Sequence, residues 1–178
     1  KDKNGNIVID FDGFMECIAQ IGPLEIELSA EEAEFINTWY EIEDNPADLT
    51  EGLNVLSPAQ TLTYARIRYV GRSDWERTER QRRVIGKAFE KVKDLKLPEL
   101  LALADSVLPC LTTDMDNMML LNLVRLVYAA HMQISGTCSV PVDGSWRYAT
   151  ISGMAVILPD IAKNASALQE YLYEGSNN

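Results

Sequence analysis

Hydrophobic and polar positions along the chain follow two periods, one of two residues and one of three to four. A period of two is typical of a strand, because successive side chains of a strand point to opposite faces. The clearest case is Leu24–Leu28, where leucine and isoleucine alternate with glutamate. Short apolar or alternating runs predict further strands at residues 7–9, 134–140, 146–151 and 155–158.

Apolar residues at three- and four-residue steps predict helices between these strands. Three of the helices begin at capping signals: Asp10 or Asp12 for the first, Ser29 with Glu32 for the second, and Ser57-Pro58 for the third. The predicted helices cover residues 10–21, a segment from 29 onward, 58–68, 74–95, 97–108, 114–131 and 160–173, and residues 43–54 form an acidic surface loop. We therefore predict a mixed α/β fold, with helices packed on both sides of a central mixed sheet, in a single domain over residues 1–178.

Composition limits the function more than the fold. The 178 residues are 47% hydrophobic and carry a net charge of −11, which argues against general affinity for nucleic acid. Three cysteines (Cys17, Cys110 and Cys138) are far apart in the sequence and form no CxxC motif, so spacing supports neither a zinc site nor a disulfide framework. One pair could form a disulfide, but spacing does not say which. No apolar run approaches the ~18 residues of a membrane span.

Positive charge is concentrated between Tyr64 and Arg83, against the trend of the whole chain. This stretch holds seven arginines and three acids, a net charge of +4. On a helix over residues 74–95, the apolar stripe Ile85, Ala88, Val92 and Leu95 continues backward through Gln81 to Arg77. A guanidinium turned inward needs an anionic partner, because an unpaired internal charge is very costly.

Not every arginine of the cluster has to bind a ligand. Glu76–Arg80 and Glu79–Arg83 are spaced as i,i+4 pairs, which favours exposed surface ion pairs, with no role in ligand binding, for Arg80 and Arg83. Arg66, Arg68, Arg77 and Gln81 are predicted to face inward. From the residues alone, a phosphate or sugar-phosphate site and an internal salt-bridge network remain equally good interpretations of these four.

The same residues resemble the signature of a known family. A Tyr-x-Arg-x-Arg segment at Tyr64–Arg68, followed by Asp-x-x-Arg-x-x-Arg-Gln at Asp74–Gln81, is similar to the LytR-CpsA-Psr family. The flanking stretches IVIDFDGFMECIAQIGPLEIEL and LTEGLNVLSPAQTLTYARIR resemble that family too. Pro23 and Ser57-Pro58 depart from it, each where the family usually has glycine. The resemblance covers about residues 5 to 173.

The resemblance implies a phosphotransferase of the bacterial cell envelope. Such an enzyme moves an anionic glycopolymer (teichoic acid or capsular polysaccharide) from a polyprenyl-pyrophosphate carrier onto peptidoglycan. Carried over by position, Arg66 and Arg68 would be catalytic, and Arg66, Arg68, Arg77 and Gln81 would bind the pyrophosphate. The family's domain begins before Lys1, with a membrane anchor, further strands and aspartates that bind magnesium or manganese. We therefore expect no metal ligand in this chain, a protein held at the outer face of the membrane, and a fragment that is inactive alone.

Two alternative functions accompany this interpretation, and one structural expectation follows from it. The family has been described as transcriptional attenuators, which the acidic chain and inward arginines disfavour. The chain could also be a lipid-carrier binding module without catalysis. Lastly, if the sheet lacks strands, strand 6–10 or 24–28 would pair with another chain.

Other segments suggest weaker candidates. The apolar stretch 118–130 predicts a helix buried between layers or, with helix 97–108, the wall of a channel for a polyprenyl tail. Asp10 and Asp12, and Asp114 and Asp116, fit helix starts better than a metal site. The single histidine, His131, has no serine-hydrolase motif to accompany it.

Overall fold

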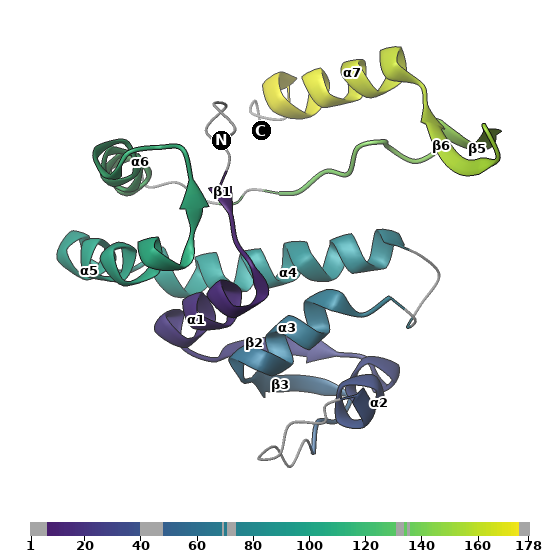
Figure 1. Cartoon of the computed structure of the whole chain (residues 1–178). Coiled ribbons are helices and arrows are strands. Elements are labelled where there is room, and N and C mark those ends of the chain that lie inside the picture. The colour runs from purple at the N-terminus through teal and green to yellow at the C-terminus, as the bar shows by residue number, and fades with distance from the viewer. Residues whose placement is uncertain are drawn as a thin grey trace. The chain divides into compact units, whose positions relative to one another are not determined.

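The computed structural model describes residues 7–39, 48–68, 70, 74–130, 134 and 136–174. The chain divides into two compact units, Lys1–Gln133 and Ile134–Asn178, and each is described by itself. Helices and short strands alternate along the chain (Figure 1). The mixed α/β fold predicted from the sequence is confirmed. The described strands form three separate two-stranded antiparallel sheets, so the expected central mixed sheet is not seen among the described residues.

The first unit contains two of these sheets. Strand β1 (Ile7–Val8) pairs with β4 (Thr112–Thr113), and β2 (Leu24–Leu28) pairs with β3 (Gly52–Leu56) from Leu24 opposite Leu56 to Leu28 opposite Gly52. The alternation predicted for β2 is confirmed, because Leu24, Ile26 and Leu28 are buried and the glutamates between them are exposed. The predicted loop 43–54 is wrong at its end, since β3 begins at Gly52; residues 43–47 lie outside the described residues.

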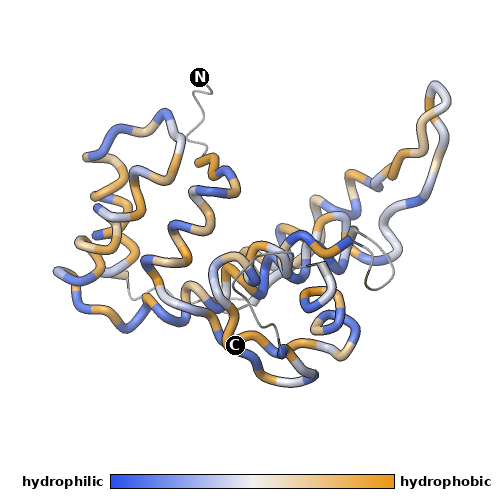
Figure 2. The backbone as a smooth tube through the Cα atoms, turned by 60° about the horizontal axis from the view of Figure 1, so that its bottom comes forward, coloured by the Kyte–Doolittle hydropathy of each residue, from blue (hydrophilic) through white to orange (hydrophobic). Residues whose placement is uncertain are grey.

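Six helices and one 3-10 turn complete the described part of this unit. They are α1 (Phe11–Ile21), α2 (Ala30–Trp39), α3 (Pro58–Arg66), α4 (Asp74–Val92), α5 (Leu97–Val107), η1 (Leu108–Cys110) and α6 (Asn117–Ala129). Asp10, rather than Asp12, caps α1 by accepting a hydrogen bond from Gly13 N at 2.8 Å. Ser57 and Gln60 form a reciprocal capping box on α3, and Asp116 caps α6. Colouring by hydropathy shows hydrophobic and hydrophilic residues alternating along the helices (Figure 2).

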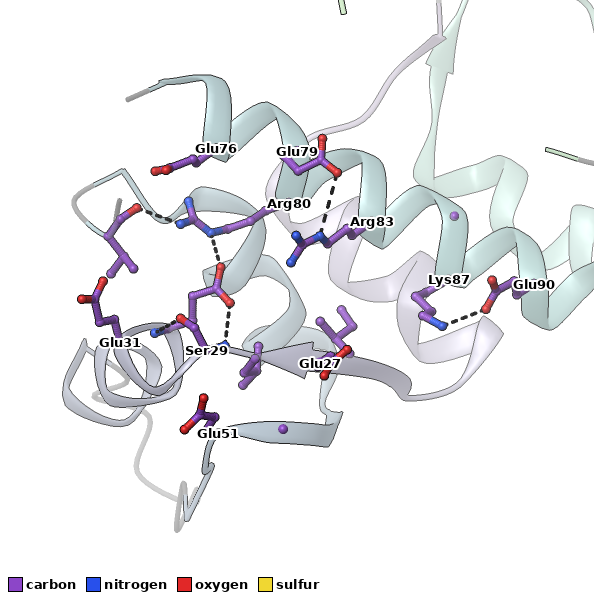
Figure 3. A pocket seen from close by; sticks show the side chains of 16 residues that line it. Glu27, Ser29, Glu31, Glu51, Glu76, Glu79, Arg80, Arg83, Lys87 and Glu90 are labelled. Atoms are coloured by element: carbon purple, nitrogen blue, oxygen red, sulfur yellow. Dashed lines mark hydrogen bonds and ion pairs between the residues drawn. The ribbon is translucent and has the colours of Figure 1, made fainter. Parts of the chain in front are cut away.

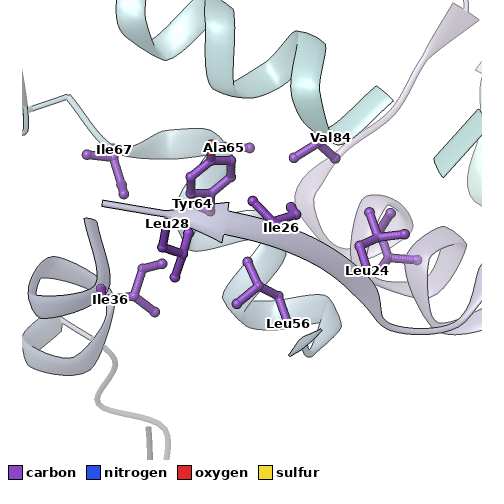
Figure 4. Packing of buried hydrophobic residues seen from close by; sticks show 11 residues of the cluster. Leu24, Ile26, Leu28, Ile36, Leu56, Tyr64, Ala65, Ile67 and Val84 are labelled. Atoms are coloured by element: carbon purple, nitrogen blue, oxygen red, sulfur yellow. The ribbon is translucent and has the colours of Figure 1, made fainter. Parts of the chain in front are cut away.

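The core of the first unit lies between β2 and the helices α2, α3 and α4 (Figure 4). Tyr64, Ile36, Leu56 and Ile67 are fully buried there. Ala65 and Ile67 lie in this core, whereas Arg66 and Arg68 are exposed. The backbone at the end of α3 and just after it therefore directs Ala65 and Ile67 inward and Arg66 and Arg68 outward.

The second unit is built on a β-hairpin. Strands β5 (Trp146–Ile151) and β6 (Met154–Pro159) pair along their whole length, joined by Ser152-Gly153 in the left-handed backbone region. Helix α7 (Ile161–Gln169) follows and continues as a wider turn, η2 (Glu170–Glu174). The predicted strand 134–140 is wrong over its described residues, which are irregular. A strand needs a neighbouring strand to hydrogen-bond with, and in this unit β5 and β6 pair with each other rather than with these residues.

The three cysteines are unpaired, and two of them lie close together. Gly13 on α1 lies so close to Cys110 that an added Cβ would stand 2.4 Å from the Cys110 carbonyl oxygen. Cys17, one turn after Gly13, is buried, and its thiol interacts with that of Cys110. Burial, and then the Cys110 thiol, raise the pKa of Cys17 to about 11.

This raised pKa predicts a large difference in thiol reactivity. Because the thiolate is the nucleophile, a pKa near 11 leaves roughly one Cys17 thiol in a thousand ionised at pH 8. We expect iodoacetamide to modify the exposed Cys138 at least about a hundredfold faster than Cys17 in the native protein, as followed by mass spectrometry. In 6 M urea the difference should shrink to a few-fold. Equal native rates would show that Cys17 is not shielded.

Candidate functional site

Arg80 is the most buried of the described arginines in this cluster. Its side chain is 5% exposed, and its Nε donates to Glu32 Oε1 on α2 at 2.8 Å. Its two terminal nitrogens donate to the carbonyl oxygens of Ile67 at 3.1 Å and Val70 at 2.7 Å. The predicted exposed role of Arg80 is therefore wrong. Its partner is Glu32 on α2, 48 residues away in the sequence, so the pair connects two elements that are distant in the chain.

Glu32 has two tasks in this arrangement. Its second oxygen accepts from Ser29 N at 3.0 Å, while Ser29 Oγ accepts from Glu32 N at 3.2 Å. The predicted capping box of α2 is thus confirmed. One carboxylate both caps a helix and neutralises a buried guanidinium, so α2 and α4 are joined through a buried, hydrogen-bonded charge pair.

Arg83, on the same side of α4, has a mixed environment. It lies 3.9 Å from Glu79, as its spacing predicts, and its side chain is half-exposed. It also donates to the Tyr64 hydroxyl at 3.4 Å. Burial, followed by the nearby Glu32, raises the pKa of Tyr64, so this phenol is neutral at physiological pH and accepts the hydrogen bond.

The structure places the four predicted site residues around the junction of α3 and α4. Gln81 Nε2 donates to the Ala65 carbonyl at 3.4 Å, which brings Gln81 beside the base of Arg66. The Arg66 guanidinium lies 4.1 Å above the Phe11 ring, at the start of α1. Arg68 is exposed, two residues after Arg66, and Arg77 is half-buried, one turn before Gln81 on α4. The predicted inward orientation is wrong for Arg66, Arg68 and Gln81, whose side chains are exposed because Ala65, Ile67 and Arg80 take the core positions beside them. Gln81 and Arg66 are brought together, and the binding roles of all four remain predictions.

The buried face of α4 differs by one residue from the predicted stripe. Val84 is buried and Ala88 packs against the core, but Ile85 is 64% exposed. One residue corresponds to about 100° around a helix, so the core face runs through Arg80, Val84 and Ala88. Gln81 is therefore exposed. It lies beside the core face of α4, on the same side of the helix as Arg77, and close to Ala65.

An open cavity of about 930 Å³, lined in part by Arg80 and Arg83, lies between α4 and the β2–β3 sheet (Figure 3). Its lining includes the cations Arg80, Arg83 and Lys87, and a larger set of glutamates. These are Glu27, Glu31, Glu32, Glu51, Glu76, Glu79 and Glu90. Sequence reasoning missed this cavity, although alternating glutamates on β2 and repeated glutamates on α4 were visible signals.

The described residues contain no group of three or more His, Cys, Asp or Glu side chains placed to hold a metal. Asp10 and Asp116 are used as helix caps, as predicted. His131 lies outside the described residues. We accordingly assign no metal ligand in this part of the chain.

The apolar helices α5 and α6 pack against each other, but α6 keeps much apolar surface uncovered. Met118, Met119, Leu123 and Leu126 are all exposed, so the interpretation of this helix as buried between layers is wrong for that face. A lipid channel beside it stays a prediction. In the part of the chain that the structure describes, no helix has the length and apolar character needed to cross a membrane.

Comparison with known proteins identifies the family and the fold of the chain. A model of the LytR_cpsA_psr family matches residues 4–170. The fold is similar to that of Bacillus subtilis TagV (TM-score 0.65, 20% identity, 93% of this chain and 63% of TagV). It is also similar to a transcriptional regulator from Enterococcus faecalis (0.64, 19%, 95% and 59%) and to TagT bound to LIIa-WTA (0.65, 15%, 92% and 58%).

No protein of curated function matches the chain. The chain spans about three fifths of the length of these three solved structures, and at such identities they show the fold alone. The family model, however, covers most of the chain. The chain therefore belongs to the LytR-CpsA-Psr family, as its arginine motif predicted.

Proposed function

We propose that the protein is a phosphotransferase that attaches anionic glycopolymers to peptidoglycan at the outer face of the bacterial cell membrane. The observation that carries this proposal is the exposure of the Arg66 and Arg68 side chains on a backbone that is hydrogen-bonded to α4. Membership of the family supports it. So does a neighbour of the same fold, TagT, described as bound to LI-WTA and LIIa-WTA.

In the proposed reaction, a hydroxyl of peptidoglycan attacks the phosphorus that carries the glycopolymer. A new P–O bond forms, the P–O–P bond of the carrier breaks, and polyprenyl phosphate leaves with the electron pair of that bond. The hydroxyl proton passes to solvent or to a base that we do not assign. Arg66, Arg68 and Arg77, with the Gln81 amide, would hold the pyrophosphate oxygens and stabilise the negative charge that grows on the leaving group.

A metal would assist the same step. Magnesium or manganese, when bound, would supply further positive charge to offset the charge of the pyrophosphate. The described residues supply no ligand group for it, so we propose only the arginine contacts within this chain. Peptidoglycan as acceptor, and attachment to the membrane, likewise belong to the proposal.

The test separates the transferase from its alternatives. The protein is mixed with a polyprenyl-pyrophosphate-linked oligosaccharide and peptidoglycan fragments, with and without magnesium, and release of polyprenyl phosphate is followed by mass spectrometry. For a protein with the complete family domain, magnesium-dependent transfer is the expected result, whereas residues 1–178 alone are expected to be inactive. Binding of the lipid without any transfer by the complete domain would instead favour a carrier-binding module, and absence of both would refute the proposal.

A regulator that binds nucleic acid is the weaker alternative. One structural neighbour is described as a transcriptional regulator. The net charge of −11 nevertheless opposes association with phosphate backbones.

A further inference from the structure

The end of α3 and the segment that follows it are held at three backbone carbonyls by two consecutive residues of α4. Arg80 donates to the carbonyls of Ile67 and Val70, and Gln81 donates to that of Ala65. These carbonyls bracket Arg66 and Arg68 in the sequence. A single stretch of α4 therefore fixes the backbone on both sides of the two exposed arginines.

Core packing acts on the same segment. Ala65 is 7% exposed and Ile67 is fully buried, so the residues that alternate with the two arginines are held in the core. With its side chains packed and its carbonyls hydrogen-bonded, this backbone has little freedom to turn. Arg66 and Arg68 thus leave the core in fixed directions, which is what recognition of a bidentate anion requires.

The buried ion pair between Arg80 and Glu32 is not needed merely to fill the core at this position. Well-packed apolar side chains of similar volume often give equal or greater stability. Apolar side chains, however, cannot donate to the carbonyls of Ile67 and Val70. The planar guanidinium can bond Glu32 and both carbonyls at once, whereas the compact ammonium of a lysine does not reproduce that fork. The direction of the donors, more than the charge, explains an arginine at this position.

We propose that Arg80, neutralised by Glu32, is a positioning residue that presents Arg66 and Arg68 to the pyrophosphate. Arg80 itself lies inside the core, where Glu32 and the two carbonyls occupy its nitrogens, and it does not contact the ligand. This inference rests on the proposed function, because it assigns Arg80 a task in the same site. It extends that function to a residue whose sequence spacing indicated only a surface ion pair.

The experiment compares Arg80→Lys with the unaltered protein. Affinity for geranylgeranyl pyrophosphate is measured by calorimetry, and amide hydrogen exchange is measured over residues 65–68. We expect Arg80→Lys to keep the unit folded, to weaken binding at least tenfold, and to speed exchange over 65–68 more than in the rest of the core. Leu56→Ala is the matched control: it truncates a fully buried side chain on β3, so it weakens the core without removing a donor to these carbonyls. Below its unfolding transition it should bind as the unaltered protein does.

Each outcome decides a separate question. Unchanged affinity in a folded Arg80→Lys variant overturns the proposal. If that variant does not fold, the double variant Glu32→Leu/Arg80→Met, which leaves no unpaired charge, takes its place with the same expected loss. Absence of binding by the unaltered protein refutes the proposed function. In that case, exchange over residues 65–68 that is faster in the Arg80 variant but not in the Leu56→Ala control would still establish that Arg80 holds this segment. Unchanged exchange in the Arg80 variant would refute the positioning role too.

Discussion

Replacing Glu32 by alanine should lower the free energy of unfolding of the first unit by about 3–5 kcal/mol. The substitution leaves the guanidinium of Arg80 inside the core with two carbonyls but no carboxylate. A buried charge deprived of its partner retains its full desolvation cost. The same change removes the acceptor for Ser29 N at the start of α2, which adds to the loss.

Urea denaturation followed by circular dichroism measures this effect. Glu79→Ala is the matched control, because Glu79 pairs with Arg82 and Arg83 on the surface of α4 and should contribute less than about 1 kcal/mol. The double variant Glu32→Leu/Arg80→Met should be clearly more stable than Glu32→Ala, since it removes both charges together. A loss below about 1 kcal/mol for Glu32→Ala would show that the pair is not desolvated as the structure indicates.

The burial of Arg80 could not be predicted from the sequence. Hydrophobic periodicity predicted the length and type of α4 well, but it selected Ile85 for the core, where the structure has Val84. An arginine is a poor choice for a buried position unless its partner is known. That partner, Glu32, lies 48 residues away and was already assigned to a capping box, so no local pattern connected the two.

Features fixed by neighbouring residues were predicted more accurately. The caps at Asp10, Ser29, Ser57 and Asp116 form within one helical turn, and all four are observed. Strands depend on a distant partner as well as on their own pattern. Strand β3 was therefore hidden by Gly52 and Asn54, residues typical of turns, and the strand-like stretch 134–140 formed none over its described residues. The family itself was recognised because its motif is local, whereas the acidic cavity is assembled from separate elements.

Removing Arg66 and Arg68 together, by Arg66→Ala/Arg68→Ala, should weaken binding of geranylgeranyl pyrophosphate at least about a hundredfold. Each charge-assisted hydrogen bond to a phosphate oxygen contributes about 1.5–3 kcal/mol, and about 1.4 kcal/mol corresponds to a factor of ten in affinity. Both side chains are exposed, so their loss should change the unfolding transition very little. Arg77→Ala alone should weaken binding at least about tenfold by the same reasoning.

Calorimetric titration at fixed ionic strength distinguishes specific contacts from general attraction of an anion. Lys87→Ala removes one positive charge from the same helix, at a side chain that pairs with Glu90 on the cavity side, and should leave the affinity within about twofold. If the Arg66/Arg68 double variant and Lys87→Ala reduce affinity equally, the arginines act only through net charge, and the site assignment fails. A loss confined to Arg66, Arg68 and Arg77 would instead locate the pyrophosphate at the junction of α3 and α4, where α4 already holds the backbone that carries two of them.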